Sequence, residues 1–294
     1  MMRRMVEFLL PIFSRLCTLI LSVSATGIIG YLVYKGASGL HAPAIFGDTP
    51  PLQALIFRQP VFYGLFPAIC GTILLVIFSV GIALPLGVSG GIYMAELASP
   101  GIRHWFGLAF DILSGLPSIV IGLTGFSVTV FLHKHFFSAL FPCLLVSALS
   151  LSFLVMPYLV RSTQMALESI PRSVRMTGLA LGATRMQNIF RVLIPHSLSG
   201  IMSGIILAIG RCAEDTAVIM LTGAVATAGV PDSMFDSYEA LPFYIFYMSS
   251  QYANAQELSS GFSAALILIL ICVFLYSLSL FIQRRLSGQL FYRF

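Results

Sequence analysis

Six long apolar runs dominate this sequence and decide what the chain can fold into. A helix that crosses a membrane needs roughly 20 mostly apolar residues, and each run is long enough. Charged residues make up only 9% of the chain, whereas soluble domains carry about a quarter. We therefore predict an all-α polytopic membrane protein with about six transmembrane helices, at 13–34, 66–93, 109–132, 136–160, 199–226 and 260–283.

The first two runs each raise a question. Arg3 and Arg4 before an apolar run are typical of a signal peptide, but the run is long enough to span, so we expect an uncleaved first helix. The run 66–93 contains Pro85 and several glycines near its end. Proline and glycine are tolerated at membrane depth where neighbours or a water-filled cavity satisfy the backbone. We predict that this run ends in a broken or re-entrant stretch.

The Lys and Arg residues predict the orientation, because cytoplasmic segments of membrane proteins are enriched in them. With the N-terminus inside, the outer segments hold only Lys35, Arg58 and Lys134, and Arg211 lies inside a span. All the others fall on inner segments: Arg3, Arg4, Arg15, Arg103, Arg161, Arg172, Arg175, Arg185, Arg191, Arg284, Arg285 and Arg293. We therefore predict a bacterial inner-membrane protein with both termini in the cytoplasm.

Several chemistries are excluded by what the sequence lacks. It contains no G-x-x-x-x-G-K-[ST] motif, so it cannot form a P-loop, and no catalytic triad is visible. The cysteines lie in apolar stretches without a C-x-x-C pair, and His133 and His135 point to different sides of a helix. The sequence has no basic run with interleaved aromatic residues, so we expect no nucleic-acid partner. We expect no enzymatic activity, no metal site and no cofactor bound by this chain.

The largest inner segment, 161–198, is the only one large enough to dock another protein. One short helix is predicted from Pro171 toward Gly182, a helix-ending residue, and Thr184 is placed to cap a second helix. Pro195 is expected to end this second helix and turn the chain into the next span. One face of the second helix carries Met186, Ile189, Phe190 and Leu193. Two interpretations stay open: a helix lying on the membrane surface, or one that fits a groove on a partner.

Three charged residues, Arg211, Glu214 and Asp215, lie inside the predicted span 199–226. Ionisable groups at such depth normally face a bundle interior or a water-filled path, and spacings of three and four place both acids within reach of the arginine. Small residues recur every four positions beside them and predict close approach of another helix: Gly200, Gly204, Ala208, Cys212 and Thr216.

Two interpretations of these charges stay open. In the first, they form an ion pair that locks helices together. In the second, they belong to an anion path, where a carboxylate would accept a hydrogen bond from a phosphate that still carries a proton. Sulfate has no proton to donate, so Asp215 would disfavour it.

The stretch from Gly182 to Pro195 resembles the EAA loop of ABC-importer permeases, with a Gly thirteen residues before a Pro and an apolar cluster ahead of that Pro. In that family the loop docks into a cleft of the ATPase subunit. Met176 stands about where the family has an acidic residue, so we expect docking by packing rather than by charge. The resemblance implies a coupling role for Gly182, Ala183, Met186, Ile189, Phe190, Leu193 and Pro195.

Further stretches at 85–96, 111–122 and 200–217, followed by Leu241-Pro-Phe, are similar in order and spacing to phosphate-transport permeases of PstA type, over about residues 62–285. The resemblance implies the ABC type I importer permease fold. It places Arg211 and Arg161 at the family's functionally important arginines, although a boundary charge that sets topology explains Arg161 equally well. Asp215 stands where the family usually has Glu, and Glu214 where it usually has Gly.

The same resemblance implies partners and a domain division. We expect a second permease of PstC type, an ATPase dimer of PstB type that holds the ATP and Mg²⁺, and a periplasmic phosphate-binding protein of PstS type. The division is an N-terminal helix and first loop (1–61), the importer transmembrane domain (62–285) and a tail (286–294). Alternatives are a permease for another oxyanion such as molybdate, sulfate or phosphonate, and an ATP-independent secondary transporter, although the two related halves common in that class are not visible.

Overall fold

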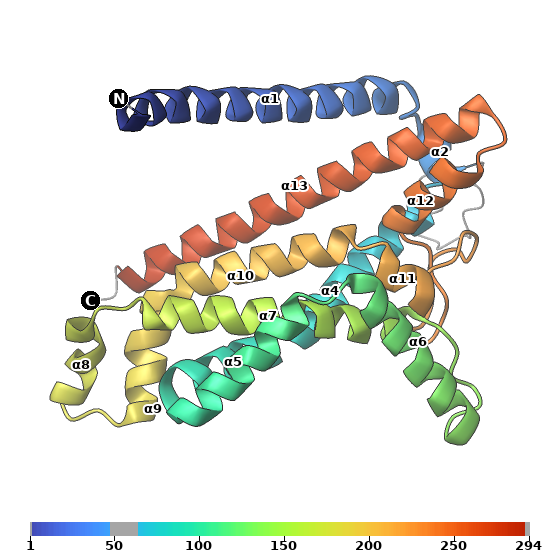
Figure 1. Ribbon diagram of the computed structural model, residues 1–294. Helices are drawn as coiled ribbons and strands as arrows, with labels where there is room; N and C mark the ends of the chain where they lie inside the picture. The colour runs from blue at the N-terminus through green and yellow to red at the C-terminus, as the bar shows by residue number, and fades with distance from the viewer. Residues whose placement is uncertain (1, 48–63, 292–294) are drawn as a thin grey trace.

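A computed structural model describes residues 2–47 and 64–291, and this part of the chain is almost entirely helical (Figure 1). Five helices are long and apolar enough to cross a membrane, or six if the bent pair α5 (Pro100–Ser114) and α6 (Ser118–His135) counts as one span. The prediction of about six transmembrane helices is confirmed. The five are α1 (Met2–Ser38), α4 (Phe66–Ile92), α7 (Leu144–Glu168), α10 (Ile194–Glu214) and α13 (Ala255–Phe291).

The core of the bundle lies where α4, α7 and α10 pack together. Leu75 of α4, Leu151 and Leu159 of α7 and Ala208 of α10 are buried in one apolar cluster. Helix α1 lies on the outside and contacts α13 near its own C-terminal end, around Gly36. The two helices diverge toward the N-terminus (Figure 1). Short helices α2 (Ala42–Phe46), α11 (Ala217–Thr222) and α12 (Leu241–Gln251) lie at one end of the bundle.

The small residues of α10 form the line along which it meets α7. A side chain at Gly204 would sit only 1.9 Å from the Ser162 hydroxyl, and one at Gly200 would collide with Ala166. Ala208 and Cys212 continue the same line and are buried. The predicted close helix contact is confirmed at Gly200 and Gly204, whereas Thr216, the last residue of the predicted line, lies beyond the end of α10.

The second span departs from prediction, because α4 runs unbroken through Pro85. Its glycines serve packing rather than a break: side chains at Gly87 and Gly91 would collide with Leu159 and Thr163 of α7. The irregularity comes only afterwards, as one π-helical turn, η1 (Tyr93–Leu97), which continues α4. The predicted re-entrant stretch is therefore wrong.

The third and fifth predicted spans are interrupted. Helices α5 and α6 meet at an angle of 98° across residues 115–117, so the continuous helix 109–132 is wrong. The residue before a proline is disfavoured in helix, which places the break ahead of Pro117. The predicted span 199–226 ends at Glu214, because Asp215 takes an extended conformation before α11. The fourth span, predicted at 136–160, begins later, at Leu144.

The predicted two-helix loop, here called the coupling hairpin, consists of α8 (Arg172–Ala180), α9 (Arg185–Asn188) and the π-helical turn η2 (Ile189–Leu193) that continues α9. Gly182 has φ of 81°, a conformation that glycine adopts readily. Thr184 caps α9 through a reciprocal capping box with Gln187. Both helix boundaries agree with the sequence prediction.

Pro195 does not end the second hairpin helix, contrary to prediction. Helix α9 passes through a π-helical turn, η2 (Ile189–Leu193), directly into α10. Pro195 lies in the first turn of α10, and the chain changes direction at η2 (Figure 1). A π turn inserts an extra residue, so it can redirect a helix without ending it.

We predict that Gly204→Val destabilises the bundle, because the added side chain would force α10 away from α7 at Ser162. Overpacking of this kind costs about 1–3 kcal/mol. The matched control is Gly81→Val in α4, where no atom lies within 4 Å of an added Cβ. Thermal unfolding in detergent should show a lower midpoint for the Gly204 variant alone. Equal midpoints for the two variants would contradict the packing described here.

Candidate functional site

The structure brings the charged trio together at the end of α10. An Arg211 Nη atom lies 3.4 Å from Asp215 Oδ2, and the other lies 3.9 Å from Glu214 Oε1. The three side chains differ in exposure: 2% for Asp215, 37% for Arg211 and 62% for Glu214. Asp215 can therefore contact only groups of its own chain, whereas Glu214 is accessible from outside the bundle.

Asp215 is fully engaged within the chain. Its Oδ1 accepts a hydrogen bond of 2.9 Å from the Val218 backbone N–H at the start of α11, while Oδ2 faces Arg211. The side chain thus joins the end of α10 to the next helix across the extended residue. The carboxylate exposed beside Arg211 is that of Glu214.

Glu214 ends a stripe of exposed residues on α10 that does not face α7, and Ser199, Ser203 and Leu207 precede it. Arg211 lies at the edge of this stripe and is only partly exposed, because it follows Gly204 of the α7 contact line by seven residues. Charged groups are costly against lipid tails. This face of a membrane-spanning helix therefore suits a neighbouring protein chain or water better than lipid.

Arg161 holds a different position in the bundle. It donates to the Asp111 carboxylate at 3.0 and 2.6 Å and to the Gly107 carbonyl at 2.8 Å, which ties α7 to α5. Its neighbour Ser162 packs at Gly204, seven residues before Arg211, or about 10 Å along the helix. The structure does not bring the two arginines together in the described part of the chain.

Asp111 is a site residue that sequence reasoning missed. With Arg161 it lines a cleft of about 460 Å³ between α5 and α7. Asp111 stands near the start of the predicted span 109–132, and a charged residue within an apolar run indicates a functional or paired group. The remaining lining residues are Arg103, His104, Gly107, Leu108, Gln164 and Glu168.

The apolar face predicted for the second hairpin helix is divided in two. Ile189 and Leu193 are buried in a cluster with Ala95, Leu167 and Ile170. Phe190 and Met186 are exposed instead, on the outside of the hairpin. The hairpin has three further exposed apolar side chains. We call the whole set of five its docking surface: Met176, Leu179, Leu181, Met186 and Phe190.

A buried carboxyl group organises the loop between α11 and α12. The Glu239 side chain accepts hydrogen bonds from the Ala228 and Gly229 backbone N–H groups at 3.1 and 2.9 Å. The loop is also fastened to α4, because Thr72 Oγ1 accepts a 2.9 Å hydrogen bond from the Leu241 backbone N–H. Burial raises the pKa of Glu239, and the two backbone N–H groups offset part of that rise.

This raised pKa predicts a pH dependence. The folded protein holds the Glu239 proton more tightly than the unfolded chain, in which the pKa of this group is 4.5. The stability that the folded protein gains from this proton is therefore fully present below pH 4.5, and it is lost as the pH rises through the pKa of the folded state. Glu239→Gln keeps an acceptor oxygen without the charge, so its stability should lack this part of the pH dependence. Thermal unfolding in detergent at a series of pH values measures this. Glu239→Ala, which loses the acceptor, should be destabilised by about 1–3 kcal/mol. An unchanged pH profile in the Gln variant would contradict this assignment.

Comparison with known proteins places this geometry in a family. Residues 87–288 match the family described as the binding-protein-dependent transport system inner membrane component. The chain is 31% identical over 251 residues to the phosphate transport system permease protein PstA of Yersinia pestis, covering 84% of this chain and 79% of that protein. It is 28% identical to the probable ABC transporter permease protein YqgI of Bacillus subtilis, covering 86% and 87% of the two chains.

Solved structures show the same fold. A chain in the crystal structure of a bacterial alginate ABC transporter, in complex with an alginate-bound periplasmic protein, superposes with a TM-score of 0.61. The match covers 92% of this chain and 95% of that chain at 17% identity. The predicted ABC type I importer permease fold is confirmed. The chain belongs to the inner membrane component family of binding-protein-dependent transport systems, and it is a multi-pass permease subunit that works with an ATPase and a substrate-binding protein.

Proposed function

We propose that this chain is the PstA-type permease subunit of an ATP-driven importer of inorganic phosphate. The observation that carries the proposal is the Arg211–Glu214 pair at the end of α10, in which Glu214 is exposed and Arg211 is partly exposed. The sequence similarity to phosphate permeases such as that of Yersinia pestis supports the choice of substrate. The chain would form half of the pathway, and a second permease of PstC type the other half.

Phosphate chemistry suits this pair. The Arg211 guanidinium can donate two hydrogen bonds to phosphate oxygens. Near neutral pH phosphate keeps at least one proton, so it can donate a hydrogen bond to the Glu214 carboxylate. Sulfate lacks that proton, so it would meet only repulsion from Glu214. Asp215, the acid that the sequence predicts for this role, is buried and instead pairs with Arg211 and with the Val218 backbone N–H.

Transport would proceed by alternating access driven from the coupling hairpin. An ATPase dimer of PstB type, holding ATP and Mg²⁺, would bind the docking surface and move the helices that continue from the hairpin. A binding protein of PstS type would deliver phosphate to the opposite end. Helix α1 begins and α13 ends toward the hairpin end of the bundle (Figure 1), which supports cytoplasmic termini in the inner membrane of a bacterium.

The substrate assignment predicts a selective loss of uptake. In proteoliposomes that contain the complete complex, Arg211→Gln should lower the rate of phosphate uptake about tenfold or more. The substitution removes a charged hydrogen bond to the substrate. Lys134→Gln, at the exposed end of α6, serves as the control and should transport normally. Labelled phosphate uptake in wild type should be inhibited by unlabelled phosphate, and Glu214→Gln should let sulfate compete. Stronger inhibition of the wild type by sulfate or molybdate would favour another oxyanion.

The docking surface predicts where the ATPase binds. Phe190→Asp places a charge among exposed apolar side chains, so we expect about a tenfold loss of ATPase co-purification with the tagged chain. The matched control is Phe137→Asp, because Phe137 and Phe190 are similarly exposed, at 64% and 60%. Phe137 lies between α6 and α7, away from the hairpin. Equal co-purification of both variants would place the ATPase contact elsewhere.

A further inference from the structure

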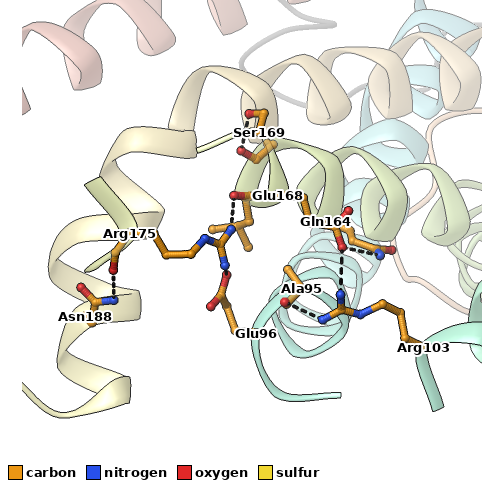
Figure 2. Close-up of polar contacts among 10 residues, drawn as sticks. Ala95, Glu96, Arg103, Gln164, Glu168, Ser169, Arg175 and Asn188 are labelled. Carbon is orange, nitrogen blue, oxygen red and sulfur yellow. Dashed lines mark hydrogen bonds and ion pairs between the residues drawn. The ribbon is translucent and has the colours of Figure 1, made fainter. Parts of the chain in front are cut away.

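Beneath the coupling hairpin, four elements meet at one polar junction (Figure 2). They are the π-turn η1 at the end of α4, the start of α5, the end of α7 and α8 of the hairpin. Two arginines connect them, Arg175 of α8 and Arg103 of α5. Figure 2 shows their guanidinium groups approaching the segment of Ala95 and Glu96 from opposite sides.

Arg175 reaches from the hairpin to two different helices. One Nη atom pairs with the Glu96 carboxylate of η1, and the other donates to the Leu167 carbonyl of α7 at 2.6 Å. The Glu96 side chain is only 13% exposed, so water screens this pair weakly. The Asn188 side chain, from α9, donates to the Arg175 carbonyl at 3.0 Å and so fixes α8 against α9.

Arg103 makes the complementary set of contacts from α5. It donates to the Ala95 carbonyl of η1 at 2.8 Å, and its other Nη atom lies 3.7 Å from the Glu168 carboxylate of α7. The two arginines thus bind consecutive residues on both partners. Arg175 contacts a carboxylate side chain on η1 and a backbone carbonyl on α7. Arg103 does the reverse: it contacts a backbone carbonyl on η1 and a carboxylate side chain on α7.

The network continues from Glu168 along α7. Gln164 donates to Glu168 at 2.9 Å and accepts from Arg161 at 3.2 Å, and Arg161 pairs with Asp111. Since Arg103 and Asp111 both belong to α5, this helix is fastened to α7 at two points, two turns apart. The hairpin is therefore connected to α5 through η1 and α7.

We propose that Arg175 and Arg103 form an arginine clasp, which makes the coupling hairpin, the end of α4 and α5 move as one body during transport. Arg175 is in this view a positioning residue for ATP-driven import, and the proposal rests on the proposed function. Removing one partner of such a shielded pair leaves the other charge without compensation. Loss of the Arg175–Glu96 contact would then let the hairpin move without the helices.

The first test measures the ratio of ATP hydrolysed to phosphate imported by the complete complex in proteoliposomes. Glu96→Gln and Arg175→Gln should each raise this ratio by about tenfold, while the ATPase still co-purifies. The exchanged pair, Glu96→Arg with Arg175→Glu, should restore part of the coupling, because it rebuilds the contact. Arg172→Gln removes an exposed charge from the same helix and should leave the ratio unchanged.

Two outcomes of this test would overturn the clasp. In the first, hydrolysis and import fall together in the single variants and the exchanged pair does not recover, which indicates a general folding defect. In the second, all variants keep the wild-type ratio.

A second measurement does not depend on the transported solute. Spin labels on α5, at Trp105→Cys, and on α13, at Phe281→Cys, report the movement of α5 when ATP is added to the complex. Both positions are exposed. A cysteine-free background that keeps ATPase activity is required. The distance between the two spin labels should change on addition of ATP when Arg175 and Glu96 are both native. This change should be lost in Glu96→Gln and recovered in the exchanged pair. If the wild-type complex does not import phosphate but shows this pattern, the proposed substrate fails and the clasp stands. An unchanged α5 movement in Glu96→Gln would refute the clasp.

Discussion

Pairing between arginine and carboxylate joins elements of this bundle at several points where helices end or break. In the described part of the chain, Arg161 with Asp111 joins α7 to α5, and Arg175 with Glu96 joins the hairpin to α4. A bundle in lipid gains little from burying apolar side chains, because lipid tails are as apolar as leucine. Specific polar contacts and close packing of small residues must therefore decide which helices stay together. The contact of Gly204 with Ser162 supplies the second of these.

Arg211 follows the same principle but leaves one acid exposed. Asp215 is buried and joins two helices, whereas Glu214 faces outward from the bundle. Asp215 therefore fits the interpretation of a lock between helices, and the exposed Glu214 is the acid for which we propose a role in the anion path. The apolar hairpin divides in a similar way, with Leu193 packed inward and Phe190 exposed.

Apolar length and helical spacing predicted much of this architecture from the sequence. Span number, the capped hairpin and the α10 contact line follow from local patterns, since each depends on residues within one or two turns. The break before Pro117 and the unbroken passage through Pro85 could not be predicted, because neighbouring helices decide whether a proline interrupts a helix. Pairs such as Arg175 with Glu96 also escaped prediction, because 79 residues separate the partners. The domain division at residue 61 lies outside the described residues and stays a prediction.

In the proposed function this chain is a gate that an ATPase on another polypeptide moves through the coupling hairpin. The most direct measurement is phosphate uptake into proteoliposomes that contain either the chain alone or the complete complex with its binding protein. ATP or a non-hydrolysable analogue would be supplied on the ATPase side. Our account predicts uptake only by the complete complex and only with ATP. Phosphate uptake by the chain alone, or equal uptake with the analogue, would contradict it.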